Sequence, residues 1–175
     1  MKYESRRMER TTETVAKLRS EYEHVIDLTH FEARGLALEG KGSIVFHHRA
    51  RCFLIARSER SCPEVIDYLV AEWNKLSKVA YRAITFEAWD ETGSIIYHTD
   101  CMLSLLGNHA FVCADAIKNV EERQAVLEVL HPLKPILLTH FQIGQMAANA
   151  QCVRAADGKL CVIQSERGFN SLTDE

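Results

Sequence analysis

The chain has 175 residues, of which 47% are hydrophobic and 26% are charged, with 8 Gly and 3 Pro. A chain of this length can bury a sizeable core as one domain, and the composition excludes collagen-like, mucin-like and broadly disordered chains. The formal net charge of −3 gives no global positive field. We therefore expect neither nucleic acid nor an anionic membrane surface as a partner.

Membrane insertion and secretion are also not expected. No apolar run approaches the roughly 20 residues of a membrane span, and the charged start of the chain does not resemble a signal peptide. The six cysteines form no CxxC pair, and several lie in apolar runs. We interpret them as mostly buried free thiols in a reducing cytoplasm rather than as a disulfide framework.

The first half of the chain predicts a helix, three strands and a second helix. A helix over about 12–20, capped by a threonine hydroxyl, precedes a short strand at 25–26. The apolar runs 43–46 and 52–56 predict a strand pair. Residues 61–64, Ser-Cys-Pro-Glu, predict a helix start capped by the serine, and the apolar residues that follow recur at helical spacing.

The second half continues the alternation. A strand at 83–88 leads through a turn to a strand region at 94–106, which continues at 111–113. Apolar positions from 117 to 130 mark another amphipathic helix. The other predicted strands are 136–138, 152–153 and 160–163, with a hairpin turn at 157–158. The pattern indicates an α/β fold, and its tight hairpins exclude a purely parallel sheet.

The first candidate site residue is Glu39, which lies between Leu38 and Gly40 in the segment Leu-Glu-Gly-Lys-Gly-Ser. A carboxylate beside two glycines, just before an apolar strand, allows a ligand to approach the backbone closely. The alternative is an ordinary turn with a solvated glutamate, because glutamate is mostly exposed in proteins.

The second candidate is the His98-Thr99-Asp100 segment. In an extended chain His98 and Asp100 share one face, about 6–7 Å apart along the strand. A histidine near neutral pKa is suited to moving protons. The alternatives are a core histidine satisfied by Asp100 and a metal site, for which no third ligand stands at a recognisable spacing.

The third candidate is Arg60, in the segment Ala-Arg-Ser-Glu-Arg after an apolar strand. An arginine is suited to binding a carboxylate through two hydrogen bonds. The alternative is a solvated loop cation.

Taken in order, these segments resemble the amidinotransferase or guanidino-modifying superfamily, the penteins. The likeness is greatest to the arginine-deiminase-related branch, which includes citrulline-utilisation hydrolases, and runs from about Val25 to Leu172. The segments that carry it are Asp27-Leu28-Thr29, Leu38-Glu39-Gly40 with Gly42-Ser43, Ser58-Glu59-Arg60, Gly93 with Tyr97-His98-Thr99-Asp100, Gln145-Met146 with Asn149, and Ser165-Glu166-Arg167.

The resemblance implies a propeller of five ββαβ-type blades with the active site in a central channel. It implies that Glu39 and Asp100 bind the guanidinium or ureido nitrogens, that His98 is the general acid/base, and that Arg60 lies near the substrate carboxylate. A thiolate attacks the central carbon, and the histidine protonates the leaving amine. It implies no cofactor and no metal.

The chain also departs from the family pattern. None of the six cysteines has the Gly-rich context of the family's nucleophile, and an early acidic substrate-binding residue has no match. We expect residues 1–175 to form a single partial pentein-like domain of about three blades, truncated and lacking its nucleophilic cysteine. Lys41 replaces a small polar residue. Asp100 replaces an asparagine of the citrulline branch, which favours a guanidine over a urea.

The expected function is hydrolysis of a guanidino or ureido amino acid. The alternatives are a non-catalytic remnant that binds a small cationic metabolite or a protein partner, and, last, a metal-dependent hydrolase that uses His98 and Asp100. A missing blade leaves unpaired strand edges, so we expect either self-association or association with a partner, or marginal stability.

Overall fold

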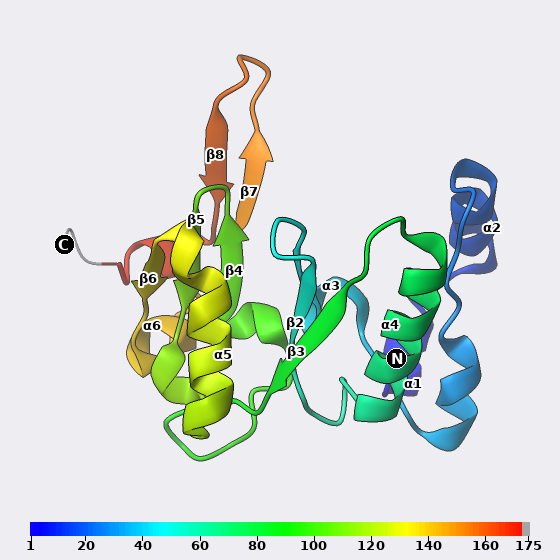
Figure 1. Ribbon diagram of the computed structural model, residues 1–175, viewed down its shortest axis with the longest axis horizontal. Coiled ribbons are helices and arrows are strands. Elements are labelled where there is room, and N and C mark those ends of the chain that lie inside the picture. Colours follow the sequence, from blue (N-terminus) through cyan, green and yellow to red (C-terminus); the bar gives the residue numbers. More distant parts are fainter. Residues whose placement is uncertain (173–175) are drawn as a thin grey trace.

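The computed structural model describes residues 1–172. Its organising unit is a strand hairpin followed by a helix and a third, parallel strand. Figure 1 shows two such ββαβ units beside each other, with a further hairpin projecting from the body. The predicted mixture of hairpins and parallel pairs is confirmed.

The first unit contains β1 (Val45–His47), β2 (Cys52–Ala56), α4 (Pro63–Leu76) and β3 (Arg82–Phe86). β1 pairs antiparallel with β2, and β3 pairs parallel with it, so β2 is the middle strand. All five residues of β2 are buried. Its alternate side chains enter two separate core clusters, because successive residues of a strand point to opposite faces.

The second unit repeats this order with β4 (Leu103–Leu106), β5 (His109–Val112), α5 (Val120–Leu130) and β6 (Pro135–Leu137). β5 is the middle strand, antiparallel to β4 and parallel to β6. The Asn119 side chain accepts a hydrogen bond from the Glu122 amide and caps α5. The helices at 63–76 and 120–130 confirm the two amphipathic helices expected from periodicity.

The chain ends in a smaller third part. β7 (Gln151–Arg154) and β8 (Leu160–Ile163) form the expected antiparallel hairpin, and no further strand of the described residues pairs with β8. The short helices before and after it are α6 (His140–Gly144) and α7 (Glu166–Phe169). Every residue of β8 is exposed, unlike β2.

The N-terminal region consists of short helices that lie before the first sheet. They are α1 (Glu4–Arg7), α2 (Thr12–Glu21) and α3 (Gly40–Ser43), and α2 is capped by the Thr11 hydroxyl as expected. Four 3₁₀ turns complete the described elements: η1 (Thr29–Arg34), η2 (Thr99–Cys101), η3 (Ala114–Ala116) and η4 (His131–Leu133).

Three local predictions are wrong. Residues 25–26 form no strand. The N-cap of α4 is Cys62, not Ser61, because Ser61 is paired through its backbone with Ser58 in the preceding turn. The region 94–106 is a strand only from Leu103, since residues 99–101 form η2.

In residues 1–172 no helix is both long and apolar enough to span a bilayer. The same residues contain no group of three or more His, Cys, Asp or Glu side chains placed to hold a metal ion.

Candidate active site

A cavity of about 770 Å³ is lined by both of the sequence segments that carry Glu39, His98 and Asp100. Glu39, His98 and Asp100 all line it, together with Lys41 and residues of the N-terminal helices. Residues 39 and 98 are far apart in sequence, so the fold brings them together. The glycine segment and the His-x-Asp segment therefore share one hollow.

Glu39 is enclosed, with a side chain 8% exposed, against 18% for His98. Its Oε1 accepts a hydrogen bond from the Lys2 amide at 2.8 Å, and its Oε2 lies 3.1 Å from His98 Nε2 and 3.6 Å from Arg60 Nη1. Burial acts to raise the pKa of Glu39, but the Lys2 amide, His98 and Arg60 outweigh it, so the pKa is lowered. Glu39 is therefore an ionised hydrogen-bond acceptor at neutral pH.

The backbone on both sides of Glu39 fixes its position. Leu38 bridges to Ser61, and the Glu39 amide donates to the Arg60 carbonyl at 3.1 Å. Gly40 then has a φ of +52°, which a glycine adopts without steric cost, and α3 begins there. Close approach of a ligand to this backbone stays a prediction.

His98 lies directly against Gly42. A β-carbon on Gly42 would lie 2.7 Å from His98 Nδ1, so only glycine leaves room for the ring. The following residue anchors the segment: the Thr99 hydroxyl donates to the Ser43 carbonyl at 2.5 Å and accepts from the Ala56 amide at 2.8 Å. The imidazole is thereby held with Nε2 toward the Glu39 carboxylate.

Asp100 reaches the cavity by a route that the sequence did not predict. It belongs to η2 and not to an extended strand, because the Cys101 amide turns back to the His98 carbonyl at 3.2 Å. Burial raises the pKa of Asp100, and the charges of His98 and Lys41 partly oppose this. The predicted alternation on one strand face is wrong, although both side chains still line the cavity.

Arg60 contacts Glu39 but is not among the residues that line the cavity. Its guanidinium lies 4.2 Å from the ring centroid of Tyr97 and 5.1 Å from that of Tyr3. Such cation–π contacts are favourable when desolvated. Its Nε is buried and has no hydrogen-bond partner among the described residues. A role for Arg60 at a ligand carboxylate stays a prediction.

Sequence reasoning missed the residues that support the site from outside it. Lys2 contributes only a backbone amide, which no side-chain pattern can reveal. Tyr3 donates to Glu59 and stacks on Arg60 from a part of the chain that carries no motif. Tyr97 could have been recognised from the sequence, because this aromatic residue directly precedes His98. Tyr97 is 45% exposed.

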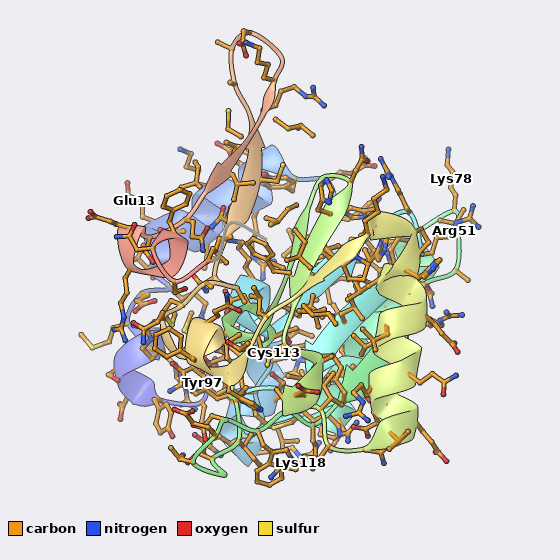
Figure 2. All side chains as sticks on the ribbon, turned by 90° about the vertical axis from the view of Figure 1, so that its left-hand side faces the viewer. Glu13, Arg51, Lys78, Tyr97, Cys113 and Lys118 are labelled. Carbon is orange, nitrogen blue, oxygen red and sulfur yellow. The ribbon has the colours of Figure 1, made fainter. Side chains whose placement is uncertain are left out.

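None of the cysteines lines this cavity within the described residues. All six are free. Cys101 lies nearest in sequence to the site, but burial raises its pKa to about 11, so its thiol is not ionised at neutral pH. Cys113 is buried inside the molecule (Figure 2).

Solved structures with a similar fold include those of ArgZ and of AgrE. The N-terminal domain of ArgZ, an arginine dihydrolase from cyanobacteria, was solved as a cysteine-to-serine variant bound to substrate. It matches with a TM-score of 0.53 and 21% identity over 70% of this chain and 45% of its own. Apo ArgZ matches with a TM-score of 0.56 and 20% identity over 82% and 23%. AgrE, solved with ornithine and NAD⁺, matches with 0.52 and 17% over 74% and 20%.

These matches define the fold as that of the penteins, and the chain spans less than half the length of each of these structures. The family model described as "N,N dimethylarginine dimethylhydrolase, eukaryotic" matches residues 1–175. The chain therefore belongs to this family of the pentein superfamily, which confirms the superfamily resemblance. No curated protein sequence is significantly similar to it.

Proposed function

We propose that the chain binds a guanidino or ureido amino acid in the 770 Å³ cavity, with its planar nitrogen head on Glu39 and His98. The observation that carries the proposal is the Glu39–His98 contact of 3.1 Å inside a hollow that Asp100 also lines. Carboxylates bind planar nitrogen cations through charge-assisted hydrogen bonds. The family and the arginine-related relatives support this ligand class.

The reaction proposed for this class is hydrolysis of a C–N bond. Glu39 and Asp100 would hold the nitrogens, and His98 would give a proton to the leaving amine. No cysteine among residues 1–172 lines the cavity, so these residues offer no candidate there for the attacking thiolate. We therefore propose that these residues supply binding and proton transfer, and that residues 1–175 bind the ligand without turning it over.

Two broader features belong to the same proposal. The two ββαβ units and the hairpin would be blades of a pentein propeller, which the repeated order of β1–β3 and β4–β6 supports. A cytoplasmic location is proposed because six cysteines, all free, are typical of a reducing compartment. The alternative proposal is that the chain is a non-catalytic remnant that binds a small cationic metabolite or a protein partner.

The test is calorimetric titration of the chain with arginine and with citrulline, comparing Glu39→Gln, Asp100→Asn and the exposed control Glu91→Gln. Loss of a charge-assisted hydrogen bond should weaken arginine binding by about tenfold or more in the first two variants. The control should bind as the wild type does. If the wild type binds neither amino acid, the proposal fails. Release of ammonia or urea would contradict only the statement that the ligand is not turned over.

A further inference from the structure

The cations that line the 770 Å³ cavity are not equivalent. Four lysine and arginine side chains line it, and three of these are held by carboxylates. The paired ones are Arg6 with Glu9 at 2.7 Å, Arg10 with Glu32 at 2.8 Å, and Arg19 with Asp27 at 2.9 Å.

Lys41 is the fourth, and within residues 1–172 its ammonium has no carboxylate within 4.0 Å and no hydrogen-bond partner. It lies in α3, two residues after Glu39, and is exposed. Paired cations are already neutralised by their partners, whereas an unpaired ammonium is free to bind an anion. Lys41 is therefore the cation that this cavity offers to an anionic group.

Lys41 also lines a second hollow of about 270 Å³, and Asp100 lines both. Asn149 and Ser104 line the second hollow as well. Ser104 is 5% exposed, and its hydroxyl has no hydrogen-bond partner in the described residues. A buried hydroxyl without a partner costs free energy, so a polar ligand group there would satisfy it. The two hollows therefore adjoin at Lys41, whose ammonium can bind a carboxylate, and at Asp100, which the proposed function places on the head nitrogens of the same ligand.

Arg60 is less suited to that end of the ligand. Its guanidinium is ion-paired with Glu39 and stacked by two tyrosines, and it does not line either hollow. We propose that Lys41 binds the α-carboxylate of the ligand and so determines a preference for the amino acid over its decarboxylated amine. This inference rests on the proposed function, because it places the planar head on Glu39.

The experiment measures the dissociation constants of arginine and of agmatine, which lacks the carboxylate, for five proteins. These are the wild type, Lys41→Met, Lys41→Arg, Arg60→Met and, as a control at an exposed position labelled in Figure 2, Lys78→Met. The wild type should prefer arginine by about tenfold, the effect of one charge-assisted contact. Lys41→Met should lose that preference while its affinity for agmatine stays unchanged, and Lys41→Arg should retain it.

The other outcomes are equally decisive. If Lys41→Met keeps the preference for arginine, the inference is overturned, and loss of the preference in Arg60→Met would assign the carboxylate to Arg60. If Lys41→Met weakens both ligands equally, Lys41 supports the cavity instead of the carboxylate, and the inference is again overturned. Absence of binding of both ligands by the wild type overturns the proposed function and the inference with it.

Discussion

At the scale of single residues, the position of His98 depends on the missing side chain at Gly42. The ring fills the space where a β-carbon would lie, 2.7 Å from Nδ1. The backbone of Gly42 has an ordinary φ, so alanine there would be resisted by the ring and not by the backbone. The missing side chain at Gly42 thus makes room for the His98 ring, and close approach of a ligand to the glycine segment stays a prediction.

The variant Gly42→Ala should displace the His98 ring and break its contact with Glu39. We expect arginine affinity to fall by about tenfold, from loss of one hydrogen bond to a charged group. The free energy of unfolding should fall by about 1–3 kcal/mol, as for other overpacked sites. Titration and chemical denaturation measure both. Gly144→Ala is the control, because its β-carbon would meet no atom within 4 Å. Unchanged affinity in Gly42→Ala would contradict this account.

Glu32 connects the N-terminal helices to the rest of the domain. Arg10 donates two hydrogen bonds to it, at 2.8 and 2.9 Å, and lowers the pKa of Glu32 to about 2 despite its burial, with help from the N-terminal ammonium. A carboxyl group whose pKa is lowered in the folded protein stabilises the fold when the pH is above its ordinary pKa of 4.5. This stabilisation is lost as the pH falls toward 2.

Acid denaturation should therefore depend on Glu32. As the pH falls from about 4.5 to 2, the free energy of unfolding of the wild type should fall by about 2–3 kcal/mol through Glu32. Glu32→Gln lacks this contribution at every pH and should not show that fall. Urea denaturation at a series of pH values measures the difference. Glu13→Gln, at an exposed position of α2, should follow the wild-type curve. Parallel curves for the wild type and Glu32→Gln would show that the Arg10–Glu32 contact does not form.

At the scale of elements, the 3₁₀ turn η2 decides where His98 and Asp100 point. Thr99 is fully buried and joins η2 to both α3 and β2 through its hydroxyl. Thr99→Val keeps the side-chain shape but leaves the Ser43 carbonyl and the Ala56 amide without this partner.

We expect Thr99→Val to lower the free energy of unfolding by about 1–3 kcal/mol per buried group left unpaired. Arginine binding should weaken as well, because η2 is no longer fixed to α3. Thr12→Val, at an exposed helix position, should change stability by less than about 0.5 kcal/mol. A Thr99→Val protein as stable as the wild type would refute the anchoring role.

The elements that the sequence predicted well are those defined by local periodicity and turn chemistry. The strand pair at 45–56, the helix at 63–76 and the hairpin turn at 157–158 depend on neighbours in sequence. The failures depend on partners far along the chain. Residue 100 leaves the strand pattern because Thr99 bonds to Ser43 and Ala56. Within the candidate site, the Lys2 amide and Tyr3 reach Glu39 and Arg60 only in the folded molecule.

At the scale of the whole molecule, the three parts of the fold differ in how well they are covered. The middle strands β2 and β5 are mostly buried, whereas β8, with the apolar sequence Leu-Cys-Val-Ile, is exposed at all four positions. Figure 2 shows the hairpin of β7 and β8 standing clear of the body. Strands that are apolar on both faces are typical of the buried middle of a sheet, and an unpaired apolar edge is a template for pairing with another chain.

We therefore predict that the chain self-associates through β8, and that Val162→Lys weakens this association. Val162 is 51% exposed, so a lysine is tolerated in the monomer but opposes pairing of two apolar edges. Size-exclusion chromatography with light scattering over a range of concentrations should give a rising mass for the wild type and a lower one for Val162→Lys. Leu76→Lys, at a 47% exposed position in α4, should behave like the wild type. A wild-type chain that remains a compact monomer at the highest concentration would rule out the edge as a contact between copies, and leave the hairpin as a surface for a different polypeptide.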